Sequence, residues 1–258
     1  MIRYKNARQI ERIRESCELL SAMYGEMAPL VREGVETLEL DRWAQSWIKK
    51  TGGRPAFLGY GPRSCPFPGA LCVSINEEVI HGIPSRRKLQ SGDLVSIDSG
   101  IILDGFVSDK SVTFEVGQVS AEAHRLNMAT RECLYKGIAA AKAGERLHAI
   151  GRAVEGHARA FNYGIVREFC GHGVGFDVHE DPSVHNYAGC GPNPRLRAGM
   201  VLAIEPMVNM GSGDINVLDD TWTVVTADGK PSAHWEHTIA IFDDHTEILT
   251  KGDPTARS

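Results

Sequence analysis

Carboxylates stand at positions of this sequence where apolar side chains are expected. Two aspartates interrupt the strand-like stretch "LVSIDSGIILDGFVSDKSVTF", and single glutamates stand in the segments "VLAIEPMV" and "AHWEHTIAIF". A glutamate in a Val/Ile-rich strand is almost never buried unless it is paired or binds a metal. The segment "FCGHGVGFDVHEDP" adds two histidines, and its glycines let backbone approach a ligand closely. The residues that could do chemistry are therefore Asp98, Asp109, His172, His179, Glu205 and Glu236.

Two of these carboxylates, Asp98 and Asp109, are predicted to share one face of a β-hairpin. The pair Asp104-Gly105 lies between the two strand-like runs and favours a tight two-residue turn, because Asp-Gly tolerates positive φ. Pairing Leu103 with Phe106 makes the two aspartates diagonal neighbours, roughly 7–8 Å apart. Strand alternation then predicts one apolar face and one polar face, the latter made of Ser96, Asp98, Gly100, Asp109, Ser111 and Thr113.

The polar face has three explanations. Solvent alone could account for it, since antiparallel sheets often expose one face to water. Two carboxylates held close repel each other, however, unless a divalent cation or a shared proton lies between them. Four carboxylates and one or two imidazoles match the ligands of a two-metal site, whereas a proton-sharing dyad accounts for only two carboxylates. Ligation rich in oxygen suits manganese, iron or cobalt better than a closed thiolate zinc site.

Composition limits the other classes of function. The chain has 258 residues, of which 42% are hydrophobic and 24% charged, so it can bury a sizeable core. A formal net charge of −5, with no basic run longer than "SRRK", argues against nucleic-acid binding. The polar start "MIRYKNARQIERIRE" and the absence of a long apolar run indicate a cytoplasmic protein with no membrane association. Six cysteines without a C-x-x-C motif are expected to be free thiols, with Cys170 a packing residue rather than a nucleophile.

The sequence is organised as two similar halves. Apolar periodicity predicts helices over 7–31, 37–53, 120–144 and 146–164. Strand-like runs follow each helix pair, at 70–84 and 94–114 in the first half and at 200–210, 220–229 and 233–242 in the second. The segment at 33–53 also resembles the one at 143–164. We therefore expect an α+β fold in which duplicated halves form one curved antiparallel sheet with helices outside, as a single domain over 1–258.

These motifs, in this order, resemble those of the methionine aminopeptidases of type I. The resemblance extends from about Arg3 to Ile248 and includes "SINEEVIHGIP", "GHGVG", a glutamate followed by proline, "DTWTVVT" and "EHT". It implies the pita-bread fold with its pseudo-twofold halves. It also implies a hydrolase that removes the N-terminal methionine from nascent proteins and peptides when the second residue is small.

The same resemblance implies the roles of individual residues. Asp98 would chelate one divalent ion, His172 and Glu205 would bind the other, and Asp109 and Glu236 would bridge them. The ions would be manganese, iron or cobalt, with zinc as a further option, and a water between them would attack the first peptide carbonyl. Glu205 is the expected general base. His81 and His179 are expected to contact the substrate carbonyl and the scissile nitrogen, although His81 could instead be a structural residue of its loop.

The resemblance also places a methionine pocket. Its lining would be Phe57, Tyr60, Phe67, Cys72, His81, Val178 and Trp222. Phe57 stands where the family usually has a small cysteine, Val178 stands where it usually has an aromatic residue, and the loop at 61–66 is longer than expected. Lys110, beside Asp109, also departs from the family pattern. Alternation puts its side chain on the opposite face, where we expect the ammonium to reach toward solvent.

Two other functions remain open from the sequence. A related aminopeptidase or dipeptidase, such as a proline-specific enzyme, would share the fold and metals but have a different N-terminal specificity. A non-catalytic binding protein on the same scaffold is disfavoured because all five ligands are present. The expected partners are the N-termini of nascent polypeptides near the ribosome, and the expected state is a monomer.

Overall fold

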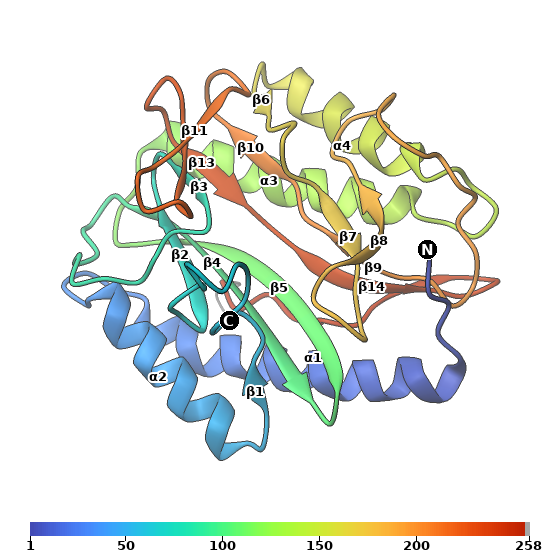
Figure 1. Cartoon of the computed structure of the whole chain (residues 1–258). Helices are drawn as coiled ribbons and strands as arrows, with labels where there is room; N and C mark the ends of the chain where they lie inside the picture. The colour runs from blue at the N-terminus through green and yellow to red at the C-terminus, as the bar shows by residue number, and fades with distance from the viewer. Residues whose placement is uncertain (256–258) are drawn as a thin grey trace.

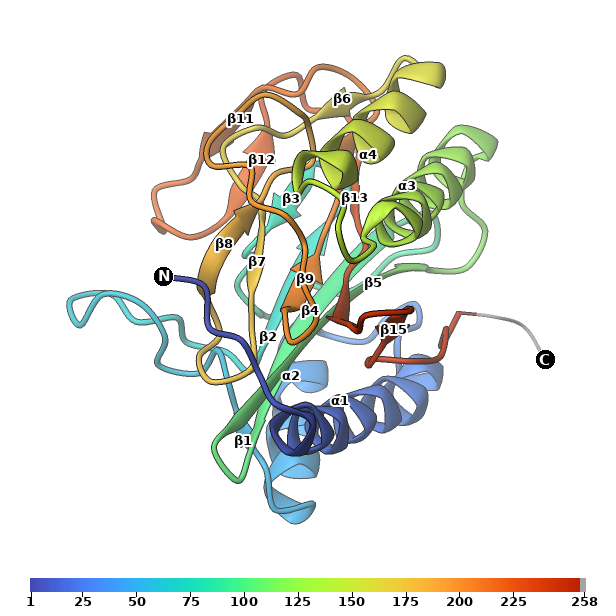
Figure 2. The same ribbon diagram turned by 90° about the vertical axis from the view of Figure 1, so that its right-hand side faces the viewer.

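Two pairs of helices enclose antiparallel strands in the computed structural model, which describes residues 1–255 (Figure 1). The helices are α1 (Ala7–Met27), α2 (Thr37–Lys50), α3 (Ala121–Ala140) and α4 (His148–Ala160), with a 3-10 turn η1 (Ala28–Leu30) after α1. Figure 2 shows α1 and α2 together on one side of the strands and α3 and α4 together on another. The four predicted helices are therefore confirmed. In the described part of the chain, none of these helices is both long enough and apolar enough to cross a membrane.

A helix pair precedes the strands in each half. The first half contains β1 (Arg54–Pro55), β2 (Leu71–Ile75), β3 (Glu78–Ile80), β4 (Leu94–Leu103) and β5 (Phe106–Glu115). The second contains β6 (Gly164–Ile165), β7 (Gly171–Gly173), β8 (Glu180–Val184), β9 (Val201–Ile204), β10 (Met207–Asn209), β11 (Ile215–Val217), β12 (Val224–Thr226), β13 (Ser232–His234), β14 (His237–Ile241) and β15 (Thr246–Ile248). Each helix pair thus leads into a two-residue strand, β1 or β6, and then into longer antiparallel pairs.

Hydrogen bonding divides the strands more than the sequence predicted. Instead of one continuous sheet, the described strands form four: β1-β4-β2 with β5 on β4, β15-β14-β9-β7-β8, β13-β10-β6 and β11-β12-β3. The two larger sheets meet where the backbone N–H of Glu236 donates to the carbonyl of Ser111, at 2.9 Å. Because β13 ends at His234 and β14 begins at His237, the β10–β13 and β9–β14 pairs fall in separate sheets on either side of Glu236.

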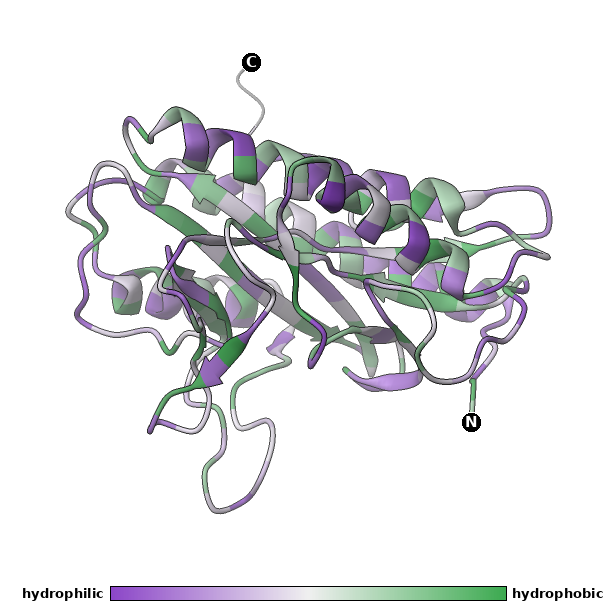
Figure 3. Cartoon of the chain, turned by 90° about the horizontal axis from the view of Figure 1, so that it is seen from above, coloured by the Kyte–Doolittle hydropathy of each residue, from purple (hydrophilic) through white to green (hydrophobic). Residues whose placement is uncertain are grey.

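Helix α1 covers the apolar face of the β4–β5 hairpin. Its buried side chains include Ile10, Ile13, Cys17, Leu20 and Met27, all on the predicted helical stripe. The hydroxyl of Tyr24 lies within hydrogen-bond distance of the carbonyls of Ile97 and Lys110. Figure 3 shows hydrophilic and hydrophobic residues alternating along the helices, as expected for helices with one face on a core. The polar face of the hairpin points away from α1, and there the hydroxyls of Ser111 and Thr113 donate to the carbonyl of His234.

Lys110 lies on this helix side of the hairpin, opposite to Asp109 as predicted. Its ammonium does not reach solvent, however, because the side chain is almost completely buried. Nζ instead contacts the carbonyl oxygens of Thr250, Lys251 and Gly252 at 3.2, 3.4 and 3.0 Å. The prediction of a solvent-seeking ammonium was wrong, because a later segment of the chain closes over the position.

Candidate metal centre and active site

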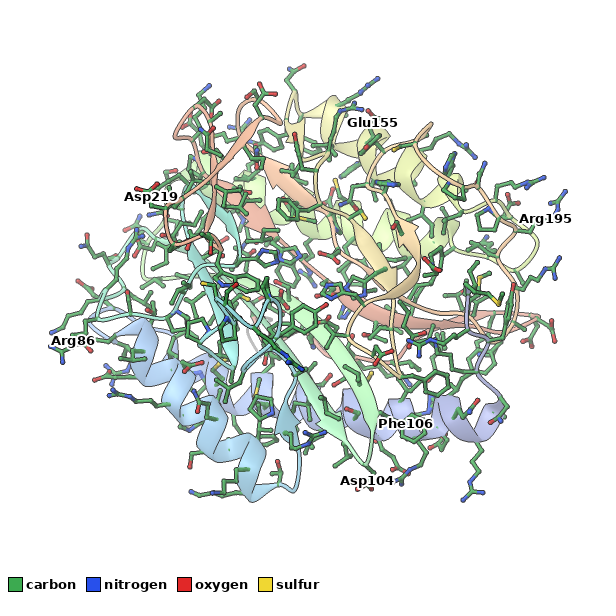
Figure 4. All side chains as sticks on the ribbon, in the orientation of Figure 1. Arg86, Asp104, Phe106, Glu155, Arg195 and Asp219 are labelled. Carbon is green, nitrogen blue, oxygen red and sulfur yellow. The ribbon has the colours of Figure 1, made fainter. Side chains whose placement is uncertain are left out.

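The five residues predicted as metal ligands line one cavity of about 270 Å³. Asp98 lies in β4, Asp109 in β5 and His172 in β7, while Glu205 follows β9 and Glu236 lies between β13 and β14. The hairpin register that pairs Leu103 with Phe106, Asp98 with Ser111 and Asp109 with Gly100 is confirmed. The tip of the hairpin, with Asp104 and Phe106, lies at the edge of the molecule (Figure 4). The aspartates therefore lie well inside, where the two large sheets meet.

The imidazole of His172 is oriented for a cation. Ligand atoms of Asp109, His172 and Glu236 all lie within 4.8 Å of one another. Nε2 of His172 is 3.3 Å from Oε1 of Glu205 and 3.7 Å from Oδ2 of Asp109. Nδ1 of His172 lies 2.9 Å from the carbonyl oxygen of Gly173. Because a carbonyl can only accept, Nδ1 is the donor, so in the neutral ring Nε2 presents a lone pair to the acidic cluster.

Within the described residues, three of the cavity carboxylates each have an oxygen that receives no hydrogen bond. Oδ1 of Asp98, Oδ1 of Asp109 and Oε1 of Glu236 are buried and have no hydrogen-bond partner among residues 1–255. Burial raises the pKa of Asp98 to about 7, and burial with the charge of Asp98 raises the pKa of Asp109 well above its ordinary value. The pKa of Glu236 is raised by burial and by Asp109. Orphaned, mutually repelling carboxylate oxygens beside a nitrogen lone pair fit divalent cations as their partners.

Glu205 differs from the other carboxylates because it has a histidine near each oxygen. Oε1 faces His172, and Oε2 lies 3.5 Å from Nε2 of His234. Burial raises its pKa, but the two neighbouring imidazoles outweigh burial and lower the pKa to about 2. The pKa of His172 is lowered by burial but raised overall by Glu205. Glu205 is thus the carboxylate of the cluster that is most firmly ionised.

Two further histidines, His81 and His179, line the same cavity. The ring of His81 contacts Phe169 and Trp222 edge to face, with ring centroids 5.5 and 6.0 Å apart. The ring of His179 lies 4.2 Å from that of His172. Burial lowers the pKa of both His81 and His179 to about 4. Both rings are therefore neutral at neutral pH.

Aromatic side chains and a cysteine form the rest of the cavity wall. Of the predicted pocket residues, Phe57, Tyr60, Phe67, Cys72, His81 and Trp222 line it. Val178 is not part of this lining; it is buried in the apolar cluster that also contains Phe57, Phe67 and Cys72. The two rings of Phe67 and Trp222 pack edge to face at 5.2 Å. The cavity thus combines an acidic floor with an apolar wall.

The long loop at 61–66 folds against Trp222. Gly61 has a φ of +94°, and a Cβ at this position would lie 2.6 Å from the indole. The indole Nε1 donates to the carbonyl of Cys65 at 3.2 Å. Backbone hydrogen bonds between Phe67 and residues 59 and 60 close the base of the loop. The loop therefore contacts the indole through Gly61 and Cys65, while residues 61–66 are exposed and none of them lines the cavity.

Sequence reasoning missed two residues of the site. His234 is almost completely buried, and its Nε2 is a buried atom without a hydrogen-bond partner in the described part of the chain, lying near Glu205. Its position two residues before Glu236 was a usable signal, because strand alternation directs both side chains to one side. Phe169 lines the cavity beside His81. No periodicity in the sequence marked Phe169.

Comparison with known proteins agrees with this geometry. Residues 11–243 match the model of metallopeptidase family M24. A methionine aminopeptidase of Treponema pallidum is 49% identical over 259 residues, covering 100% of both chains. Crystal structures of methionine aminopeptidases from Rickettsia prowazekii and Thermotoga maritima each superpose with a TM-score of 0.93, at 36% and 38% identity. These alignments cover 97% and 98% of this chain and 100% of each structure. The predicted pita-bread fold is confirmed, and the chain belongs to metallopeptidase family M24.

Proposed function

We propose that this protein is a metal-dependent aminopeptidase that removes the N-terminal methionine from polypeptides whose second residue is small. The observation that carries the proposal is the single cavity in which a carboxylate-rich floor, two neutral imidazoles and an apolar wall meet. Full-length similarity to proteins named methionine aminopeptidase supports the same reaction. An apolar wall beside a charged floor suits a substrate with an apolar first side chain and a polar amino terminus.

Two divalent cations are the cofactors that this donor set fits. The residues that would hold them are Asp98, Asp109, His172, Glu205 and Glu236. When bound, such cations supply Lewis acidity and lower the pKa of a water to near neutrality. Manganese, iron and cobalt suit a set of four carboxylates and one imidazole, and zinc is a further option.

Protein side chains carry the remaining steps of peptide hydrolysis. Glu205 is the proposed base that accepts the proton of the attacking water. His179 is proposed to donate a hydrogen bond from its imidazole to the peptide carbonyl oxygen, stabilising the charge that develops there. His81, whose ring packs edge to face against the indole of Trp222, is proposed to assist the leaving nitrogen. All three residues line the cavity.

The apolar wall is proposed to select methionine. Phe57, Phe67 and Trp222 present aromatic rings to the cavity beside the thiol of Cys72. An unbranched thioether fits such a wall, and sulfur–aromatic contacts contribute about 0.3–1.5 kcal/mol. The substrates would be N-termini of nascent chains in the cytoplasm, met near the ribosome by a monomeric enzyme.

A pair of substitutions tests the assignment of roles. His179→Ala is expected to lower kcat on a Met-Ala-Ser peptide by roughly 10²–10³, the scale of one lost oxyanion donor, with little change in metal content. Asp109→Ala is expected to lose bound metal as well as activity. Metal content is measured on each purified variant after loading with manganese or cobalt. Loss of metal from His179→Ala would identify His179 as a ligand and contradict its proposed role.

A further inference from the structure

The phenol of Tyr60 is hydrogen-bonded to the imidazole of His179. The hydroxyl oxygen lies 2.6 Å from Nδ1, and the two ring centroids are 5.2 Å apart. No other hydrogen bond of the Tyr60 hydroxyl occurs within residues 1–255. Tyr60 had been expected only as a wall of the methionine pocket. The contact gives Tyr60 a second role, because the hydrogen-bond partner at Nδ1 determines whether Nε2 carries a proton or a lone pair.

The direction of this hydrogen bond follows from acidity. A phenol O–H is a far stronger acid than the N–H of a neutral imidazole, and an imidazole nitrogen with a lone pair is a strong acceptor. Burial raises the pKa of Tyr60 further, so the phenol keeps its proton at neutral pH. The hydroxyl therefore donates and Nδ1 accepts, which leaves the ring proton of His179 on Nε2.

We propose that Tyr60 is a positioning residue that fixes His179 as the Nε2–H tautomer. The inference rests on the proposed role of His179 as a donor to the peptide carbonyl. Because Nδ1 is turned to Tyr60, the edge with Nε2 is the one left toward the cavity that His179 lines. An N–H on that edge stabilises a developing oxyanion, whereas a lone pair would repel it. The hydroxyl of Tyr60 thus keeps a proton on Nε2 of His179, where it can stabilise the oxyanion.

The neighbouring His172 shows the opposite arrangement. Its Nδ1 donates to the carbonyl of Gly173, so in the neutral ring its Nε2 carries a lone pair. The rings of His172 and His179 are only 4.2 Å apart, yet one has an acceptor and the other a donor at Nδ1. The Gly173 carbonyl therefore suits His172 to bind a metal through Nε2, whereas the Tyr60 hydroxyl suits His179 to donate a hydrogen bond from Nε2.

Tyr60 is also held in place by its loop. The backbone N–H of Phe67 donates to the carbonyl of Tyr60 at 2.8 Å, and that of Tyr60 donates to Phe57 at 2.9 Å. The next residue, Gly61, lies against Trp222 without room for a Cβ. The position of the hydroxyl is thus set by the same wall that contacts the substrate side chain. The loop at 61–66 consequently supports catalysis as well as pocket shape.

Tyr60→Phe tests the proposal because it removes the hydroxyl and keeps the ring. We expect kcat on a Met-Ala-Ser peptide to fall about tenfold, the worth of one neutral hydrogen bond, with KM and metal content within twofold of the wild type. Tyr135→Phe is the matched control: Tyr135 is similarly exposed, and its hydroxyl lies 3.4 Å from a ring nitrogen of His237, away from the cavity. This control should change neither kinetic constant.

Imidazole nitrogen NMR gives a readout that does not depend on activity. In zinc-loaded protein with ¹⁵N-labelled histidine, the wild type should show a protonated Nε2 and an unprotonated Nδ1 for His179, assigned by their loss in His179→Ala. In Tyr60→Phe the Nδ1 signal should shift because its donor is gone. The double variant Tyr60→Phe/His179→Ala should be no slower than His179→Ala alone.

The outcomes separate this inference from the proposed function. Wild-type kcat and unchanged His179 signals in Tyr60→Phe, together with a large loss in His179→Ala, would overturn the tautomer proposal and leave the role of His179 intact. Normal turnover in His179→Ala would overturn that role and the inference with it. A wild-type spectrum with the proton on Nδ1 of His179 would also overturn the inference, whatever the kinetics.

Discussion

Glu205 has an imidazole nitrogen near each of its two carboxylate oxygens. Nε2 of His172 lies 3.3 Å from Oε1, and Nε2 of His234 lies 3.5 Å from Oε2. His172 is proposed to share a cation with Glu205, whereas His234 has no other partner for Nε2 in the described part of the chain. His234 is thus placed to restrain Oε2, the carboxylate oxygen that does not face His172.

His234→Leu is expected to weaken metal binding. Removal of the imidazole leaves Oε2 of Glu205 without its nearest polar neighbour, and the loss of such outer partners typically costs about 10- to 100-fold in metal affinity or activity. His234→Gln, whose amide nitrogen can take the place of Nε2, should retain most of the affinity. Manganese affinity is measured by competition with a chelator. Equal affinities in wild type and His234→Leu would show that the contact has no role in holding the site.

Removal of metal should both stop turnover and destabilise the fold. The orphaned oxygens of Asp98, Asp109 and Glu236 repel one another when no cation lies between them. A cation that binds only the folded state adds stability by mass action. Chelation is therefore expected to abolish peptide cleavage and lower Tm, and added manganese or cobalt should restore both. Full activity after exhaustive chelation would exclude the two-metal mechanism.

The neutrality of His81 predicts a pH-dependent contribution to stability. Burial lowers the pKa of His81 in the folded protein to about 4; the smaller effect of Glu205 raises it and that of His234 lowers it. A histidine in the unfolded chain titrates near 6.5. Between these values the unfolded chain binds the extra proton, so this contribution to the free energy of unfolding falls as pH drops from about 6.5 to about 4.

His81→Asn isolates that contribution. Asparagine cannot take up the proton, and it tolerates the positive φ of +59° at this position. Urea unfolding of metal-free protein is compared at several pH values. The stability difference between wild type and variant should shrink as the pH falls through this window. A constant difference would mean that the folded and unfolded pKa values of His81 are the same.

The specificity prediction concerns Phe57, whose ring lines the cavity. We expect tripeptides that begin with methionine to be cleaved faster than those beginning with alanine, glycine or proline. Phe57→Cys removes one aromatic wall, so KM for the methionine peptide should rise about two- to tenfold, the range of a lost sulfur–aromatic contact. Preference of the wild type for alanine- or proline-initiated peptides would overturn the specificity while leaving the chemistry unchanged.

The parts of this molecule that could be predicted from sequence are those fixed by local rules. The Asp104-Gly105 turn and strand alternation were enough to give the register of β4 and β5, because both act over a few residues. The gathering of Asp98, His172 and Glu236 at one site was suggested by their residue types, and their individual roles came from the family resemblance, since periodicity does not say which distant strands meet.

The parts that were not predicted depend on such distant contacts. The carbonyl oxygens around Lys110 come from residues 250–252, about 140 positions later in the chain. The β10–β13 pair is separated from the β9–β14 pair beside Glu236, whose side chain lines the cavity. The burial of Val178 under the wall likewise reflects packing of the whole cluster.

The metal centre is shared between the two repeated halves of the chain. The first half contributes Asp98 and Asp109, and the second contributes His172, Glu205 and Glu236. The halves are not equivalent at this site, because the first supplies carboxylates alone and the second supplies the imidazole. Each half by itself holds only part of the ligand set, so neither half is expected to bind the ions without the other.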